Sequence, residues 1–197
     1  MKPWIEQYLK EQNTAAGALP VAEIAAWAGL LREAREKDRQ IFACGNGGSS
    51  ANCSHFAVDL GKGASGIFPG QSAEAAVGRK RFRVMALNDN VPWITALGND
   101  CSYDDIFVEQ LKNYGRSGDI LIAASVSGNS PNVVRAVEWA NSAGLTTLGL
   151  VGNKPGNKLA RAAKRVIAVS SGHYGRVEDC HMHILHMLCY GFIENVA

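Results

Sequence analysis

The chain has 197 residues, of which 47% are hydrophobic and 19% are charged, with a formal net charge of +2. This length and composition fit one globular domain covering residues 1–197, and the small net charge argues against a dedicated nucleic-acid surface. No apolar run could span a bilayer, and the five scattered cysteines, without a CxxC pair, predict reduced thiols in a cytoplasmic protein.

Two helices are expected at the amino terminus, over residues 4–13 and 22–38, because apolar side chains recur there with helical spacing. In the second helix Ile24, Trp27 and Leu31 share one face. This stripe would pack equally well against an oligomer partner or against the sheet of its own chain. Residues 1–38 are therefore a candidate oligomer-forming extension.

A strand, a glycine-rich turn and a helix amino terminus are predicted around residues 41–50, where an apolar run is followed by GNGGSS. Free N–H groups and the helix dipole at such a junction favour an anion, and Ser49 adds a hydroxyl donor. His55 and Asp59 follow at i and i+4, so they project from the same face. The junction suggests that a phosphorylated substrate binds there, next to a His/carboxylate pair that transfers protons or holds a metal. The glycine-rich turn by itself is explained equally well as a purely structural strand-to-helix turn.

The segment 62–81 has no periodicity and carries three basic residues at 79–81. It is expected to be either mobile surface or a flap whose basic cluster reaches over an anionic ligand. A second strand is predicted at 83–87. Helical stretches near 91–97 and 103–114 follow, with Gly98-Asn99-Asp100 between them.

A third strand, 119–124, runs into the hydroxyl-rich sequence SVSGNSP. Its continuous apolar character is typical of a buried parallel strand. Ser130 is expected at the N-cap and Pro131 at the first position of a helix that ends before Gly144. This junction is the chemical twin of the first, and two such junctions can converge on one ligand at the carboxyl ends of the strands.

Further strands are predicted at 146–151 and 165–169, with a short helix over 159–163 between them and a long helix from about 175 to the end. The alternation of strands and helices predicts an α/β fold with a doubly wound, mainly parallel sheet of five strands. The last helix is unusually rich in histidine, with Glu178 and His186 on roughly the same side. These groups suit acid/base work or a metal, or pack at a subunit interface.

Five short motifs occur in order along the chain, at residues 45–49 (GNGGS), 55–59 (HFAVD), 98–100 (GND), 125–133 (SVSGNSPNV) and 178–186 (EDCHMHILH). Together they resemble the sugar isomerase (SIS) domain, and within it the sedoheptulose 7-phosphate (phosphoheptose) isomerase branch. The resemblance extends over essentially the whole chain.

The resemblance implies a flavodoxin-like three-layer sandwich with an N-terminal helical extension, assembled as a homotetramer with active sites between subunits. It makes Asp59 the general base and His186 its partner acid. Some members bind zinc, and the matching positions here are His55, Asp59, Glu178 and His186. Substrate-binding groups are implied at Asn46, Gly47, Ser49, Asp100, Ser125, Ser127, Ser130 and Glu178.

Four departures from the branch stand out. Asp59 replaces a glutamate, Val126 a threonine and Glu178 a glutamine, and Gly175 falls about where an aspartate is expected. The more anionic set of Asp59 and Glu178 favours either a divalent metal or a shifted substrate.

The resemblance thus predicts an enzyme, an aldose–ketose isomerase of a phosphorylated sugar, with sedoheptulose 7-phosphate as the first candidate and no nucleic-acid or membrane partner. A second interpretation is a non-catalytic tetrameric SIS-domain protein, either a replication-initiation-type partner or a sugar-phosphate sensor. The presence of both histidines and both carboxylates at the matching positions favours the enzyme.

Overall fold

The computed structural model describes residues 1–67, 77–78 and 80–196. Its elements, in chain order, are α1 (Lys2–Gly17), α2 (Val21–Glu36), β1 (Gln40–Gly45), α3 (Gly47–Val58), the π-helical turn η1 (Asp59–Gly63), β2 (Arg83–Ala86), α4 (Val91–Asp100), the 3₁₀ turn η3 (Tyr103–Asp105), α5 (Val108–Tyr114), β3 (Ile120–Ser125), α6 (Pro131–Ser142), β4 (Thr146–Gly152), α7 (Lys158–Ala162), β5 (Arg165–Val169) and α8 (Tyr174–Ile193).

The five strands form one sheet in the order β2-β1-β3-β4-β5, and every pairing is parallel. All six residues of β3, at the centre, are buried, which explains why the strand reads as one continuous apolar run. The order is that of flavodoxin-like folds, with the topological switch point between β1 and β3. The predicted five-stranded doubly wound sheet is confirmed.

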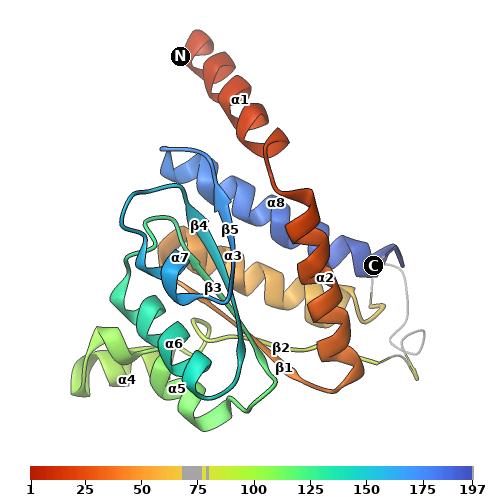
Figure 1. Cartoon of the computed structure of the whole chain (residues 1–197), viewed down its shortest axis with the longest axis vertical. Coiled ribbons are helices and arrows are strands. Elements are labelled where there is room, and N and C mark those ends of the chain that lie inside the picture. Colours follow the sequence, from red (N-terminus) through yellow and green to blue (C-terminus); the bar gives the residue numbers. More distant parts are fainter. Residues whose placement is uncertain (68–76, 79, 197) are drawn as a thin grey trace.

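Helices cover both faces of the sheet and make three layers (Figure 1). One core cluster joins α2, α3 and α8 to the sheet, and its largest fully buried side chains include Trp27 and Phe56. The second joins α5, α6 and α7 to the other face, around Phe42, Phe107 and Leu111. Each such side chain contributes about 1.5–3 kcal/mol by leaving water.

The two amino-terminal helices differ in what they bury. The stripe on α2 packs within its own chain, since Trp27 and Leu31 are fully buried and α2 contacts α8 and β1. Helix α1 extends beyond the body of the molecule and contacts α8 (Figure 1). It leaves Trp4, Ile5 and Leu9 exposed at 59%, 44% and 55%. Of the two open alternatives for the α2 stripe, the packing on its own sheet is the one observed.

Two predicted helix boundaries are wrong. Helix α4 continues through Gly98 to Asp100, because Gly98 has open space around it and the backbone bond from Cys101 N to Leu97 O (3.0 Å) completes the last turn. The helix expected over 103–114 is divided instead. The Ser102 hydroxyl accepts a bond from Asp104 N (3.1 Å), which starts a 3₁₀ turn, and α5 begins at Val108.

Half of the segment 62–81 for which mobile surface or a flap was predicted, residues 68–76 and 79, lies outside the described residues. Of its described part, residues 62–63 complete the π-helical turn η1. Lys80 forms an ion pair with Glu36 of α2 at 2.9 Å, so this member of the basic cluster is tied to the α2 surface.

In the described part of the chain no single helix is long and apolar enough to cross a membrane. Helices α1 and α2 together meet that test of length and composition, but they are bent by 64° relative to one another.

Candidate active site

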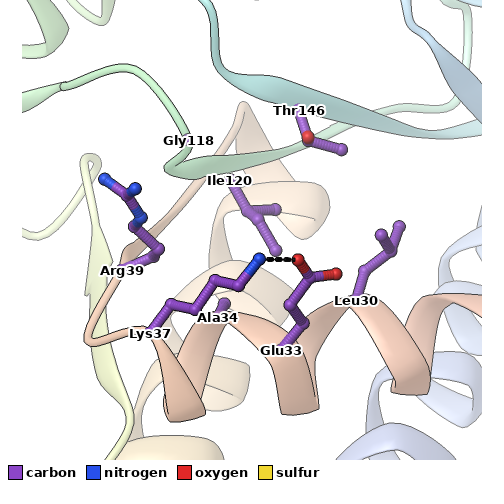
Figure 2. Close-up of a pocket in the computed structure, with 8 residues that line it drawn as sticks. All are labelled: Leu30, Glu33, Ala34, Lys37, Arg39, Gly118, Ile120 and Thr146. Atoms are coloured by element: carbon purple, nitrogen blue, oxygen red, sulfur yellow. Dashed lines mark hydrogen bonds and ion pairs between the residues drawn. The ribbon is translucent and has the colours of Figure 1, made fainter.

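A hollow at the amino-terminal edge of the sheet, beside α2, offers no group placed for chemistry (Figure 2). Its volume is about 190 Å³, and Lys37 and Glu33 pair with one another there at 2.5 Å. Leu30 and Ile120 supply apolar lining. In doubly wound folds ligands bind at the opposite edge, outside the carboxyl ends of the strands.

At that carboxyl edge a pocket of about 190 Å³ opens where β1 and β3 end and α3 and α6 begin. We call it the serine pocket. Its lining residues are Asn46, Ser49, Ala124, Ser125, Val126, Ser127, Ser130, Tyr174 and Glu178. Six of the eight predicted substrate-binding residues therefore come together at the topological switch point, from three segments distant in sequence.

The hydroxyl groups of the β3–α6 loop bond to one another. Ser125 Oγ lies 3.4 Å from Ser127 Oγ and 3.2 Å from Ser130 Oγ, and it accepts the N–H of Gly128 at 3.1 Å. Ser130 occupies the predicted N-cap position, but its side chain makes no cap bond to α6. Pro131 has no N–H and the N–H of Val133 is accepted by Asn132 Oδ1 at 2.9 Å, so in the first turn of α6 the N–H of Asn132 is the one left for an anion.

Gly128 permits a close approach that this loop requires. Its φ is +64°, and a Cβ there would lie 1.8 Å from Asn157 Oδ1, the atom that caps α7 by accepting Ala160 N at 2.8 Å. We expect Gly128→Ala to lower the free energy of unfolding by roughly 2–4 kcal/mol, from backbone strain and loss of the cap. Urea unfolding measures this. Gly29→Ala, in open space on α2, is the matched control and is expected to stabilise by roughly 0.5–1 kcal/mol.

Asn46 is held by a network that sequence reasoning did not identify. Its amide exchanges two bonds with the amide of Asn132, both of 2.9 Å, and its Oδ1 also accepts the Tyr103 hydroxyl at 3.1 Å. Asn132 is 1% exposed and also accepts the N–H of Val133. Asn46 is thereby fixed in orientation at the rim of the serine pocket.

Glu178 lies over the amino terminus of α3. A Cβ at Gly48 would sit 2.5 Å from its carboxylate, so Gly48 provides the space that this side chain occupies. The backbone carbonyl of Glu178 accepts Asn52 Nδ2 at 2.9 Å, which links α8 to α3. A carboxylate at a helix amino terminus is favoured by the helix dipole.

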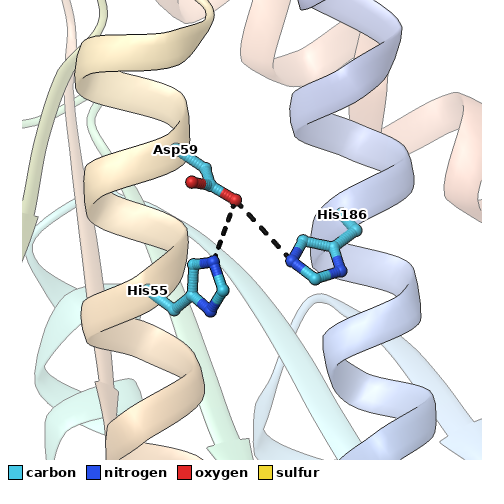
Figure 3. A group of neighbouring side chains, drawn as sticks. All are labelled: His55, Asp59 and His186. Carbon is cyan, nitrogen blue, oxygen red and sulfur yellow. Dashed lines mark ion pairs between the residues drawn. The ribbon is translucent and has the colours of Figure 1, made fainter. Parts of the chain in front are cut away.

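His55, Asp59 and His186 form a compact group (Figure 3). Asp59 Oδ2 lies 3.2 Å from His55 Nε2 and 3.6 Å from His186 Nε2, and the two imidazole rings are edge-to-face with centroids 5.0 Å apart. The His55 side chain is half exposed, whereas that of Asp59 is 23% exposed. The group is thus accessible from solvent at its histidine side and partly enclosed around the carboxylate.

Asp59 stands where α3 changes into the π-helical turn η1, whose backbone bond runs from Ala64 N to Asp59 O at 2.9 Å. Such π-helical turns are frequent at functional sites because they redirect a side chain without ending the helix. Gly61 lies close to the edge strand, with a Cβ there only 3.0 Å from Val84. The turn therefore packs closely on β2.

The three side chains of this group suit a divalent metal. Their candidate ligand atoms all lie within 4.8 Å of one another. Ligands of a tetrahedral Zn²⁺, at about 2.0–2.1 Å from the ion, are roughly 3.3 Å apart, close to both nitrogen–oxygen distances observed. The fourth predicted ligand, Glu178, is not a member of the group, since its carboxylate lies against Gly48. The set is two histidines and one carboxylate, as in catalytic rather than structural zinc sites.

The serine pocket and the His55/Asp59/His186 group are joined by two helices that lie side by side, α3 and α8 (Figure 1). Both helices begin at the pocket, with Ser49 near the start of α3 and Glu178 near the start of α8. At 1.5 Å per residue, His55 and Asp59 lie about 9–15 Å beyond Ser49, and His186 about 12 Å beyond Glu178. The two parts of the site are therefore separated by a distance on the order of 10 Å along these helices.

Asp100 is not brought to this site. It ends α4 and lines a separate hollow with Trp93 and Leu97. Tyr174, which no sequence pattern singled out, lines the serine pocket from the first turn of α8. No local signal marks Tyr174 or Tyr103, because each reaches the site only through the packing of distant elements.

His181 lies inside the fold rather than at a surface. It is fully buried, and neither ring nitrogen has a hydrogen-bond partner among the described residues. Burial lowers the pKa of His181 to about 4, since the charged imidazolium is poorly solvated there. It is neutral at pH 7. His183, two residues on, is exposed.

The comparisons with known proteins agree with this geometry. A model of the SIS domain family matches residues 7–152. The phosphoheptose isomerase of Rhodospirillum rubrum is 35% identical over 172 residues, which cover 87% of this chain and 85% of that protein. Phosphoheptose isomerase structures from Neisseria gonorrhoeae and Francisella tularensis superpose with TM-scores of 0.84 and 0.83, at 28% and 27% identity. They cover 98% of this chain, and 98% and 96% of their own.

The family match includes both βα junctions, and the superposition, which covers 98% of this chain, extends over α8 as well. The fold, the order of the motifs and the relatives all agree. The chain belongs to the SIS-domain family and, within it, is an enzyme of the phosphoheptose isomerase branch.

Proposed function

We propose that the protein is an aldose–ketose isomerase that converts sedoheptulose 7-phosphate to a heptose 7-phosphate. The observation that carries the proposal is the separation, along α3 and α8, of an anion pocket from a His/carboxylate group. An extended seven-carbon chain with its phosphate ester is roughly 10 Å long at about 1.5 Å per bond. The relatives named as phosphoheptose isomerases support the same substrate class.

In this proposal the serine pocket binds the phosphate through the hydroxyls of Ser49, Ser125, Ser127 and Ser130 and through the amino termini of α3 and α6. Asn46, Gly47 and Asp100 are the proposed contacts of the sugar chain, Asp100 from an adjacent subunit if the assembly brings it there. Phosphate binding remote from the reacting carbons supplies positioning energy.

The chemical step is proton transfer between neighbouring carbons. Asp59 removes the proton beside the carbonyl and returns it to the next carbon. His186 donates a proton to the carbonyl oxygen as the enediol forms, and takes up the proton of the neighbouring hydroxyl as that oxygen becomes the new carbonyl. Enclosure of Asp59 by η1 and α8 keeps the carboxylate in place, and His55 fixes it through the 3.2 Å contact. The carboxylate is one methylene shorter than the glutamate that the resemblance places at this position.

A zinc ion is the proposed cofactor, with His55, Asp59 and His186 as its ligands. With the ion bound, His186 would serve as a ligand instead of as the acid. When bound, zinc polarises carbonyl oxygens as a Lewis acid. Glu178 is a proposed substrate contact at the pocket rather than a ligand, because its carboxylate is directed to the start of α3.

Turnover of sedoheptulose 7-phosphate by the purified protein tests the proposal, with the isomers separated by chromatography. We expect formation of the heptose aldose, and loss of this activity on treatment with chelator, followed by recovery on adding zinc. Turnover that is indifferent to chelator would leave Asp59 and His186 as a metal-free pair. Tight phosphate-dependent binding without turnover of any sugar phosphate would instead support the non-catalytic binding protein.

The protein is further proposed to assemble as a cytoplasmic homotetramer of a single SIS domain, using α1. The exposed Trp4, Ile5 and Leu9 on this projecting helix are the supporting observation. All five cysteines are unpaired, which suits a reducing compartment.

Sedimentation equilibrium tests the assembly. We expect a tetramer for the full chain and a smaller species for a Trp4→Glu/Leu9→Glu variant, because two buried charges would each cost several kcal/mol at an apolar interface. Glu6→Gln on the same helix is the control. A monomeric full chain would exclude the assembly.

A further inference from the structure

The serine pocket has an unbalanced charge for an anion site. Its one charged lining residue is Glu178, and no cationic side chain lines it among the described residues. Bringing a phosphate dianion beside a carboxylate is unfavourable unless a cation accompanies it, and helix dipoles supply only partial charges. A nearby lysine or arginine would correct this.

The turn after β4 is attached to the loop that carries the serines. Gly152 N donates to Val126 O at 3.1 Å, and Leu159 N donates to Gly128 O at 2.8 Å. Asn157 Nδ2 donates to Gly152 O at 3.2 Å. These bonds hold the segment 152–158 against the rim of the serine pocket, so its side chains are placed relative to the pocket by the backbone itself.

Lys154 is the basic residue in the middle of this turn. Its ammonium lies on the face of the Tyr174 ring, 4.2 Å from the centroid, and Tyr174 lines the serine pocket. Within the described part of the chain, no carboxylate lies at ion-pair distance from Lys154 Nζ. A cation–π contact is a weak restraint at a half-exposed site, and a flexible four-carbon stem lets the ammonium leave the ring.

We propose that Lys154 is a substrate-binding residue: it rests on Tyr174 at the mouth of the serine pocket and supplies the positive charge for the phosphate of the sugar. The inference rests on the proposed function, since it takes the phosphate to bind in this pocket. It assigns to Tyr174 the role of holding the lysine beside the entrance. A lysine suits this task because its ammonium is a compact, mobile charge.

The test uses the full-length protein with Lys154→Met, which keeps the apolar stem and removes the charge. We expect the Kd for inorganic phosphate, measured by calorimetry, to rise about 10- to 100-fold, as for loss of a hydrogen bond to a charged group. The KM for the sugar phosphate is expected to rise by a similar factor with kcat little changed. Lys154→Arg should retain most of the affinity.

Lys158→Met is the matched control, since Lys158 lies four residues on, is exposed and does not line the pocket. It is expected to bind phosphate as the wild-type chain does. If the wild-type chain turns over the sugar phosphate and Lys154→Met has the same phosphate affinity and KM, the role of Lys154 would be overturned while the proposed function would stand. Absence of phosphate binding and of turnover in the wild-type chain would overturn the proposed function together with it.

Discussion

Asp59→Asn is expected to lower kcat by about 10²–10⁴-fold, the usual contribution of a positioned general base. The substitution keeps the size and polarity of the side chain but removes the group that accepts the proton. Asp59 Oδ2 is the atom on which His55 and His186 converge, so no other carboxylate in the group takes its place. The KM should change little, because the proposed phosphate site, the serine pocket, lies at the other end of α3.

A second measurement distinguishes the role of Asp59 as general base from its role as a metal ligand. With sedoheptulose 7-phosphate in ²H₂O, the wild-type protein should exchange the hydrogen on the reacting carbon, and Asp59→Asn should not. Metal content is measured on both proteins, and Asp59→Glu, which restores a carboxylate, should recover activity well above that of Asp59→Asn. Full isomerase activity in a metal-replete Asp59→Asn protein would falsify the assignment.

Acidification from pH 6.5 to pH 4 is expected to remove about 3 kcal/mol of stability through His181 alone. Its pKa is lowered to about 4 in the folded chain by burial, against an ordinary value of 6.5 in the unfolded chain. Below pH 6.5 the unfolded chain takes up a proton that the folded chain refuses, so the equilibrium shifts toward unfolding. The stabilisation is fully present above pH 6.5 and is lost as the pH falls through the folded value.

Urea unfolding at pH 7.5, 5.5 and 4.5 measures this dependence. Carboxylates also titrate in that range, so the informative quantity is the difference between variants. His181→Leu should reduce the loss of stability on acidification by most of the 3 kcal/mol, since leucine fills the buried site without ionising. His183→Gln, at an exposed position of the same helix, should leave the dependence as in the wild type. Equal pH dependence in His181→Leu and wild type would show that burial of this imidazole is not the cause.

The sheet could be predicted from the sequence because each strand is marked by its own short stretch of residues. Buried parallel strands are short continuous apolar runs, and all five were placed to within one or two residues of β1–β5. The helix that ends at Gly144 also follows from a local signal, since this glycine has a φ of +83°. The boundaries around Gly98 were wrong because a glycine with free space on all sides is tolerated within a helix.

The pairing of His55 with Asp59 was predictable for the same reason, as i and i+4 on one helix always share a face. The closeness of His186 to Asp59 was implied by the family resemblance, and the packing of α3 on α8 produces it. In the same packing the Glu178 carboxylate occupies the space over Gly48 and so lies apart from the His55/Asp59/His186 group.

The sequence by itself determined the fold, the two βα junctions and the types of group that make up the site. Only the tertiary structure decided that Tyr174 lines the serine pocket with Lys154 on its ring, that Asn132 orients Asn46, and that His181 is enclosed in the core. The physical reason is distance along the chain. Backbone hydrogen bonding and apolar periodicity act between near neighbours, whereas these contacts join segments tens of residues apart and depend on how the helices pack around the sheet.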